Sequence, residues 1–320
     1  YGKYLLVKLL HYGSKELRTL IVNELHGKLR KLMRHREGAY VVEDLYVLYL
    51  TAEQRKQMVR EFWGAEYAVF RDSGKGKSVV DVCNELSEKK QLITSNLIGT
   101  ITASVEKGLT GFQILHAAMK DYVSILFSNM EQNESKIREF IELLQEQFAE
   151  LVHTNEGCEV ACRLIAVATA KERKILVKSL KQHAIELVKN ENGNLVLITI
   201  FMTVDDTVMV HKAFITDLFT DDLFPPLLQD KFLRRPVIYL LKGLDGKYFA
   251  PNVKQQLLEY EKLAYAASSK KPQEQRRSEL LEKALPLANS VLITTSKPDF
   301  KFPDLSLSHI LALNIGAQTV

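Results

Sequence analysis

The sequence predicts an all-α protein, a curved solenoid of stacked helical repeats of about 36 residues. Three observations predict this fold class. A short glycine-containing element recurs along the chain at nearly constant spacing, apolar residues recur in phase with it, and the stretches between have helical apolar spacing. A repeat of this length cannot bury its apolar face alone, so neighbouring repeats must stack.

The recurring element is a glycine followed by two variable and then two apolar residues. Its six copies begin at Gly2, Gly38, Gly76, Gly111, Gly157 and Gly193, separated by 36, 38, 35, 46 and 36 residues. A seventh copy begins 41 residues later with Arg234 in place of glycine. A polar insertion around 128–135 explains the one long interval.

Apolar residues keep the same phase around each element. Six residues before it stand Leu32, Phe70, Val105, Leu151, Leu187 and Leu228. Seven residues after it stand Leu9, Leu45, Cys83, Ala118, Leu164, Ile200 and Leu241. The stretches Ile137 to Leu151 and Glu172 to Val188 lack Pro and Gly and are rich in good helix formers. Each repeat is therefore predicted to be a small group of helices.

The regular pattern decays beyond Tyr260. We therefore predict repeats over 1–265 and, over 266–320, a linker plus an irregular C-terminal helical segment. Residues 268–273 have the composition of an exposed connector, and Pro298 and Pro303 are expected to interrupt any helix near the C-terminus.

Composition excludes several classes of protein. The chain has 26% charged residues, a net charge of +4 and three cysteines, which rules out a disordered, collagen-like or disulfide-scaffold protein and favours a reducing compartment. Cys158 and Cys162 share a helix face, but a zinc site needs two further ligands nearby, so we expect no metal and no cofactor. No apolar run approaches a membrane span and no cleavable signal is visible; we expect Tyr1 to lie within a longer protein.

Charge is unevenly distributed. Residues 1–40 hold nine Lys or Arg and three Glu, whereas residues 205–230 hold six Asp and one Lys. The N-terminal part could attract polyanions, and the acidic part could not. A solvated helix face is the alternative interpretation of either cluster.

The helix after each glycine has two faces. Positions three, four and seven after the glycine are apolar and should face the core, so positions one, two and five should point the opposite way. In a stack of repeats these residues form a ladder along one surface. Three residues per repeat is the arrangement by which one repeat can address one RNA base.

At these residues the chain resembles the Pumilio-homology (PUF) repeat family, whose three-helix repeats open the RNA-facing helix with such an element. Residues 1–10 and 29–42 are most similar to the divergent nucleolar Puf-A-like branch, which includes fungal Puf proteins of ribosome assembly. The resemblance covers residues 1 to about 285. It implies further repeats before Tyr1, a nucleolar or nuclear location, and association with pre-60S particles, where RNA and proteins are contacted together. It also links the chain to mRNA control.

The ladder departs from the family's base-reading pattern. That pattern has Asn, Ser or Cys first, Gln or Glu third, and a stacking residue between. The ladders here are Lys3/Tyr4/Val7, Ala39/Tyr40/Glu43, Lys77/Ser78/Asp81, Phe112/Gln113/His116, Cys158/Glu159/Cys162, Asn194/Leu195/Ile198 and Arg235/Pro236/Tyr239. Only Ala39/Tyr40/Glu43 comes near, with Tyr40 able to stack and Glu43 able to accept from a base.

We therefore predict a non-catalytic protein that binds RNA (pre-rRNA, with mRNA as a second target) mostly through backbone phosphates, with little base selectivity. No membrane and no small-molecule substrate are expected. The predicted RNA-binding residues are Lys3, Tyr4, Lys8, Arg30, Lys31, Arg34, His35, Arg36, Tyr40, Glu43, Lys75, Lys77, Lys107, Gln113, His116, Asn194 and Arg235.

Two other interpretations remain open. Residues 74–78 imitate the end of a phosphate-binding loop after a strand, but Arg71 stands where that motif needs glycine. An armadillo- or HEAT-like scaffold that binds protein without RNA should carry a recurring Asn or Trp on its ladder surface, and only Asn194 and Trp63 are available. A combination is also open, in which the basic repeats bind RNA and the region from Asp205 to Asp230 binds a basic protein.

Overall fold

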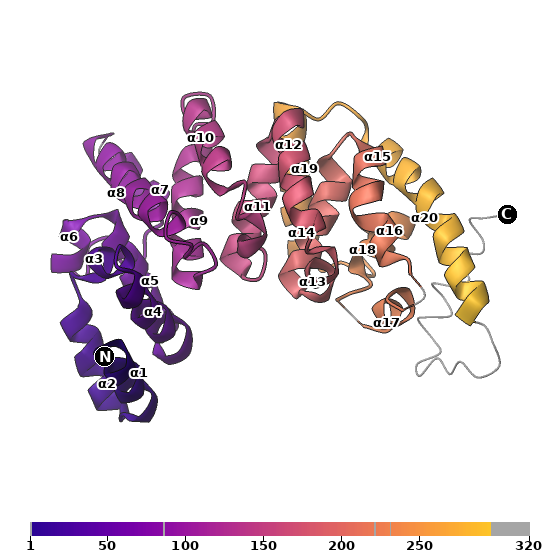
Figure 1. Cartoon of the computed structure of the whole chain (residues 1–320). Coiled ribbons are helices and arrows are strands. Elements are labelled where there is room, and N and C mark those ends of the chain that lie inside the picture. Colours follow the sequence, from indigo (N-terminus) through magenta and orange to yellow (C-terminus); the bar gives the residue numbers. More distant parts are fainter. Residues whose placement is uncertain (1, 86, 221, 231, 296–320) are drawn as a thin grey trace. The chain divides into compact units, whose positions relative to one another are not determined.

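In the computed structural model, residues 2–85, 87–220, 222–230 and 232–295 are described, and every regular element within these ranges is a helix (Figure 1). The all-α helical-repeat prediction is confirmed. The chain divides into an N-terminal unit that ends at Leu144 and a C-terminal unit that begins at Gln145. None of the described helices is long and apolar enough to span a membrane.

The N-terminal unit follows the predicted repeats. Its elements are α1 (Gly2–Tyr12), α2 (Lys15–Leu25), α3 (Leu29–Met33), α4 (Arg36–Asp44), η1 (Leu45–Tyr49), α5 (Ala52–Arg60), η2 (Glu61–Trp63), α6 (Ala65–Val69), α7 (Val79–Glu85), α8 (Ser87–Val105), α9 (Gln113–Phe127) and α10 (Glu134–Leu144). The predicted insertion forms the turn between α9 and α10. The helices that follow the glycine element are α1, α4, α7 and α9.

The C-terminal unit continues the pattern. Its elements are η3 (Phe148–Leu151), α11 (Asn155–Val167), α12 (Ala170–Lys181), α13 (Ala184–Lys189), α14 (Glu191–Thr203), α15 (Thr207–Val210), η4 (His211–Ile215), α16 (Thr216–Leu218), α17 (Phe224–Gln229), α18 (Arg235–Lys242), α19 (Pro251–Ala267) and α20 (Gln273–Thr295). Here α11, α14 and α18 follow the glycine element. The expected interruption at Pro298 and Pro303 lies outside the described residues.

The glycine of the element has a packing reason. In α14 the Asn190 side chain caps the helix by accepting from the Gly193 amide, at 3.0 Å. A Cβ on Gly193 would lie only 2.4 Å from the carbonyl oxygen of Leu187, and one on Gly38 would lie 3.1 Å from that of Leu32. In these two repeats the leucine six residues earlier therefore closes over the glycine, which explains why the two recur together there. At Gly76 nothing lies within 4 Å of such a Cβ, and a positive φ of 77° favours glycine instead.

The predicted core face is also confirmed. Positions three, four and seven after the glycine are buried in α4, α9, α11, α14 and α18. In α1, by contrast, Leu5 and Leu9 are 63% and 39% exposed.

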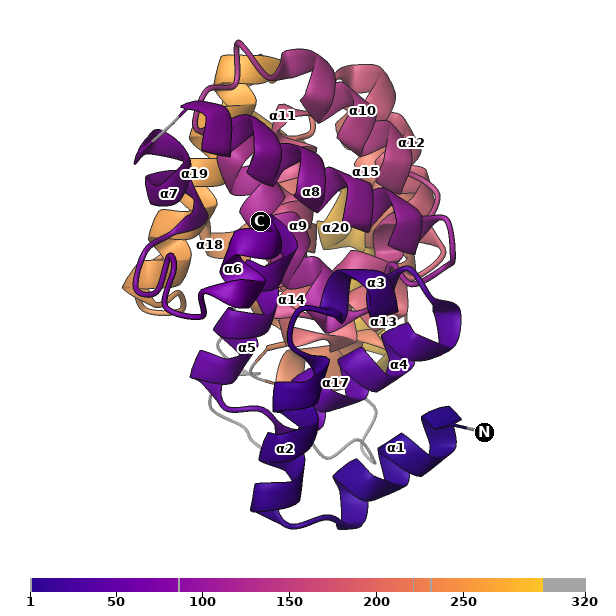
Figure 2. The ribbon, with the colours of Figure 1, turned by 90° about the vertical axis from the view of Figure 1, so that its left-hand side faces the viewer.

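The third repeat departs from the expected stacking order. Tyr40 of α4 packs against Phe112 at the start of α9, with ring centroids 5.1 Å apart, although α7 lies between them in the chain. Helix α7 instead contacts α8 and α9, and α8 contacts α3 and α9 (Figure 2). Phe70, predicted to be core, is 64% exposed. The expectation that all repeats stack in chain order is wrong for this repeat.

The segment 268–272 connects α19 to α20, as predicted, but it is only partly exposed. Ser269 is buried and its hydroxyl donates to the carbonyl oxygen of Thr203 at 2.6 Å, while the amide of Lys270 donates to Asp205 at 2.7 Å. Helix α20, which follows it, is continuous from Gln273 to Thr295 and packs against α14, α15, α17 and α18. The C-terminal helices thus belong to the core of their unit.

Candidate nucleic-acid interface

The ladder of the C-terminal unit is covered by protein. Helix α19 packs against α11 and α14, with Leu257, Tyr260 and Ala264 buried on it. Beneath it, the ladder positions Cys158, Cys162, Asn194 and Ile198 are at most 4% exposed. The expectation that these positions face solvent is therefore wrong, because a helix that follows the last repeat occupies the surface where a base would stack.

The two ladder cysteines have partners inside the protein. Cys158 donates to the carbonyl oxygen of Asn192 at 3.2 Å, and the hydroxyl of Thr199 donates to the Cys162 sulfur at 3.3 Å. The hydrogen bond with Cys162, followed by burial, raises the pKa of Cys158. Protonated thiols are poor metal ligands, and the described residues hold no group of three or more His, Cys, Asp or Glu suited to a metal ion.

Asn194 and Arg235 are both predicted to contact RNA, but in the structure both side chains make contacts within the protein. The Asn194 amide is fully buried and donates to the Phe232 carbonyl oxygen at 3.2 Å. Arg235 lies over the Phe232 ring at 4.6 Å and 3.8 Å from Glu191. Asn194 cannot contact a base without unpacking the unit.

The ladder of the N-terminal unit is only partly open. The ammonium of Lys3 lies 4.0 Å from the centre of the Tyr40 ring and 3.0 Å from a carboxylate oxygen of Glu37. A cation thus covers one face of the Tyr40 ring, and Phe112 packs against the same ring in a T-shaped arrangement. Tyr4, which is 69% exposed, is the ladder aromatic with most surface left for a base.

Glu43 is not free to accept from a base, contrary to our prediction. Its two carboxylate oxygens accept from the amides of Gln113 and Ile114, at 2.6 and 3.2 Å, at the start of α9. Burial raises the pKa of Glu43, and these two hydrogen bonds oppose the shift. The carboxylate therefore caps the helix of another repeat, where unpaired amides and the helix dipole favour a negative charge. His116, predicted to face RNA, is fully buried with Nε2 2.7 Å from the Thr110 carbonyl oxygen.

Replacing Glu43 with alanine should lower the free energy of unfolding by about 1–3 kcal/mol, because two amides of α9 lose their acceptor. Urea denaturation measures the loss, and amide exchange at Gln113 and Ile114 should become faster. RNA affinity at a temperature where the variant is folded should stay unchanged. If the Glu43→Ala variant instead lost a preference for one RNA sequence without losing stability, the result would support the original prediction that Glu43 contacts a base.

A basic cluster lies where α3 meets α8. The Lys107 ammonium donates to the Arg34 carbonyl oxygen, and Arg30 donates to the Asn96 side chain at 2.8 Å. Burial, with the nearby charge of Arg34, lowers the pKa of Arg30. The Arg34 guanidinium lies over Gly99 of α8, where a Cβ would be 3.5 Å from it. Sequence reasoning found the cations but missed Gly99, whose place inside a long helix is the signal for such a close approach.

Four of the exposed predicted cations have neither an ion pair nor a side-chain hydrogen bond among the described residues. They are Lys8, Lys31, Arg34 and Arg36. His35, between the two arginines, caps α4 through Nδ1, which accepts from the Gly38 amide at 3.1 Å. The start of α4 and the turn before it thus present exposed positive charge, and Tyr40 of the same helix is 37% exposed. This arrangement can neutralise phosphates and stack a base, but offers few groups that read base edges.

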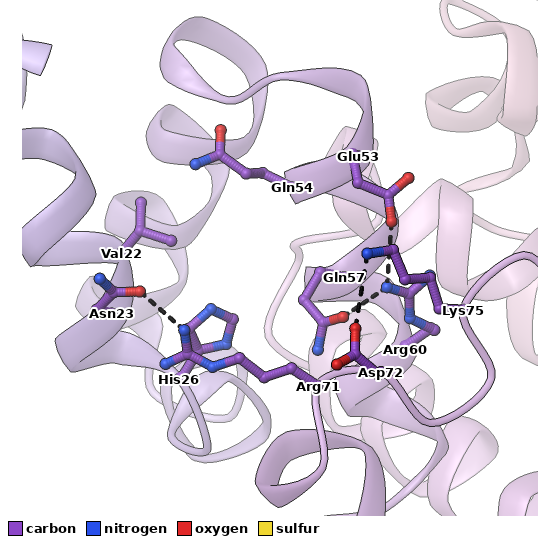
Figure 3. A pocket seen from close by; sticks show the side chains of 10 residues that line it. All are labelled: Val22, Asn23, His26, Glu53, Gln54, Gln57, Arg60, Arg71, Asp72 and Lys75. Carbon is purple, nitrogen blue, oxygen red and sulfur yellow. Dashed lines mark hydrogen bonds and ion pairs between the residues drawn. The ribbon is translucent and has the colours of Figure 1, made fainter.

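Lys75 and Lys77 are engaged elsewhere. Lys75 lies 3.6 Å from Asp72 and lines a polar pocket of about 230 Å³, across from Arg71, which donates to Asn23 at 3.0 Å (Figure 3). Lys77 pairs with Glu85. The preceding segment is helix α6 rather than a strand, so the resemblance to a phosphate-binding loop fails.

The acidic region is largely structural. Asp205 pairs with Arg276 at 2.8 Å, Asp206 caps α15, and Asp230 accepts from the amides of Phe232 and Leu233. Asp205 links α20 to the segment before α15, and its charge is offset by Arg276, whereas Asp206 and Asp230 make local caps and keep their negative charge.

Comparisons with known proteins agree with this architecture. Residues 229–320 match the CPL (NUC119) domain family. The chain is 58% identical over its full length to "Pumilio homology domain family member 6" of Saccharomyces cerevisiae, and it spans 46% of that protein, less than half of its length. Crystal structures of human Puf-A, alone and in complex with DNA, superpose with TM-scores of 0.84 and 0.81 at 26% identity; the match covers 98% and 96% of this chain and 58% of each of theirs. The chain belongs to the Puf-A-like branch of the Pumilio-homology family.

Proposed function

We propose that this protein binds RNA with little base selectivity, through the phosphate backbone, and that the N-terminal unit carries the contact. It is a binding protein and not an enzyme. The relation to human Puf-A, one structure of which is a complex with DNA, supports a nucleic-acid ligand. Because this chain is only part of the length of its relatives, the proposal concerns the part it contains.

One observation carries the proposal. The ladder groups that could read a base are occupied or buried, Glu43 by α9 and His116 and Asn194 by the core of their units. Arg34 and Arg36 of the N-terminal unit are exposed, and neither has an ion pair among the described residues. Phosphate neutralisation needs cations and no fixed base edge, so affinity without selectivity follows.

The biological setting is proposed from the family. We place the protein in assembly of the large ribosomal subunit, in the nucleolus or nucleus, where it contacts pre-rRNA and pre-60S proteins, with translational repression of mRNA as a second activity. The basic N-terminal unit supports the RNA contact.

The test is the affinity for several unrelated RNAs of equal length, one carrying a Pumilio-type target site, titrated across salt concentrations. We expect similar affinities and a steep salt slope. A strong preference for the Pumilio-type site would mean that the ladder reads bases. Failure to bind any RNA would favour the armadillo- or HEAT-like protein scaffold.

A further inference from the structure

A groove in the C-terminal unit combines an apolar floor with a basic rim. It has a volume of about 400 Å³ and is lined by residues of α12 and of the segment formed by α15 and η4, which contact each other. Val177, Val208 and Met209 contribute apolar lining, and Val208 is 48% exposed. These elements are the first helices of two consecutive repeats, whereas α19 packs on α11 and α14. The groove is therefore separate from the ladder.

Four exposed lysines line the groove: Lys174, Lys178 and Lys181 on α12 and Lys212 on η4. The three on α12 are four and three residues apart, so they follow one face of the helix over about 10 Å. Among the described residues none of the four has an ion pair.

The residues that line the groove include four lysines and one carboxylate, so the rim keeps an excess of positive charge. The lining carboxylate, Asp206, accepts from the Met209 amide at 2.9 Å and so caps α15. Next to Lys212, burial, followed by the charges of Lys283 and Lys212, lowers the pKa of His211.

We propose that this groove is a docking site for an acidic amphipathic helix of a protein partner. Its apolar side chains would fill the floor over Val177, Val208 and Met209, and its carboxylates would pair with the lysines of α12 and η4. The lysines of the rim favour a partner segment with negative charge. The apolar floor favours a segment that also has an apolar face, as an amphipathic helix does.

An RNA strand fits the groove less well than such a helix. Nucleic-acid sites that stack bases use aromatic or arginine side chains, and the lining of this groove has neither. A phosphate chain laid across the groove would leave the floor of Val177, Val208 and Met209 uncovered. Binding would then bury none of this apolar surface and gain no hydrophobic free energy from it.

The experiment uses the intact chain and three labelled peptides, read out by fluorescence anisotropy. The first is an amphipathic helix with one leucine face and one glutamate face. The second has lysine in place of glutamate, and the third has serine in place of leucine. We expect the glutamate–leucine peptide to bind at least about tenfold more tightly than either of the others, because only it satisfies both the rim and the floor.

Charge reversal sharpens the test. The double substitution Lys174→Glu/Lys178→Glu should weaken the glutamate–leucine peptide by about tenfold or more and strengthen the lysine–leucine peptide. The matched control Lys189→Glu/Lys262→Glu makes the same change of net charge at exposed lysines of α13 and α19 and should alter binding less than about twofold. Val208→Asp should weaken the glutamate–leucine peptide, and thermal melting should show that each variant is folded.

Equal affinity of all variants for the glutamate–leucine peptide would overturn the proposal. A second outcome would also overturn it: Lys174→Glu/Lys178→Glu binds a mixed-sequence single-stranded RNA more weakly than the control does, while its peptide binding is unchanged. The groove would then belong to the RNA-binding surface. Loss of RNA binding in both charge-reversed proteins alike, with peptide binding lost only in the groove variant, would support it.

Discussion

Replacing Arg34 and Arg36 together with alanine should weaken binding to every RNA alike, by about tenfold at physiological salt. Each arginine that neutralises a phosphate releases counterions, so the salt slope on a single strand should fall by about 0.7 for each phosphate that is no longer neutralised. Electrophoretic mobility shift or anisotropy titrations at several salt concentrations, with at least two unrelated RNAs, measure both quantities.

The weaker binding should not come from unfolding. The Lys107 ammonium binds the backbone carbonyl of residue 34, which alanine keeps, and Arg36 stands at the first turn of α4, where a cation is unfavourable. A matched control is Lys15→Ala/Lys56→Ala, which removes two exposed cations from α2 and α5. If this control lost as much affinity as Arg34→Ala/Arg36→Ala, the effect would be one of net charge. If one RNA lost far more affinity than the others, base reading would be involved.

The repeat architecture could be predicted because its cause is local. Gly193 and Leu187, like Gly38 and Leu32, are close in sequence and touch in the fold, so selection for that contact leaves a visible period. The core positions after each glycine follow from helix geometry alone. The displacement of the third repeat could not be predicted, because it depends on the contact of Tyr40 with Phe112, far along the chain.

The site was harder to predict than the fold. Helix spacing gave the ladder positions but not their exposure. In the C-terminal unit α19, which carries no glycine element and gave no repeat signal, packs on α11 and α14, and in the N-terminal unit Ala39 and His116 are buried. A sign was present: Cys158, Cys162 and Ile198 are small or apolar, as a surface covered by another helix requires. The same residue types also indicate an absence of base reading, and spacing alone does not separate the two interpretations. Likewise, Glu43 and Asp205 accept hydrogen bonds from amides that are distant in the sequence, so the spacing of residues cannot predict these contacts.

The same C-terminal helices lead to the largest expected change in stability. Arg276 of α20 has no exposed surface; it donates to Asp205 at 2.8 Å and to the Met202 carbonyl oxygen, and lies 5.1 Å from the Tyr265 ring centre. Asp205 also accepts from the Lys270 amide. We expect Arg276→Ala to lower the free energy of unfolding by about 3–5 kcal/mol, since it leaves the Asp205 carboxylate without its charged partner and the Met202 carbonyl oxygen without a donor. Urea denaturation of the intact chain measures it.

The neighbouring Arg277 supplies the control. It pairs with Glu274 three residues away at 2.6 Å and donates to the carbonyl oxygens of Leu240 and Leu241, but it is partly exposed to water. Arg277→Ala should therefore cost only about 1–2 kcal/mol. If Arg276→Ala lowered the free energy of unfolding no more than Arg277→Ala does, the ion pair between Arg276 and Asp205 would not be what holds α20 in place.

The free energy of unfolding at acid pH gives a second test of the ion pair between Arg276 and Asp205. Burial tends to raise the pKa of Asp205, but the hydrogen bonds from Lys270 and Arg276 outweigh it and hold the pKa below its usual value. The folded state therefore binds this proton less tightly than the unfolded chain, so the contribution of the pair is complete above the ordinary carboxyl range and is lost as pH falls through the lowered pKa. Asp205→Asn should be less stable than the parent at neutral pH and should lose less stability on acidification; an unchanged slope would place the acid sensitivity at other carboxylates.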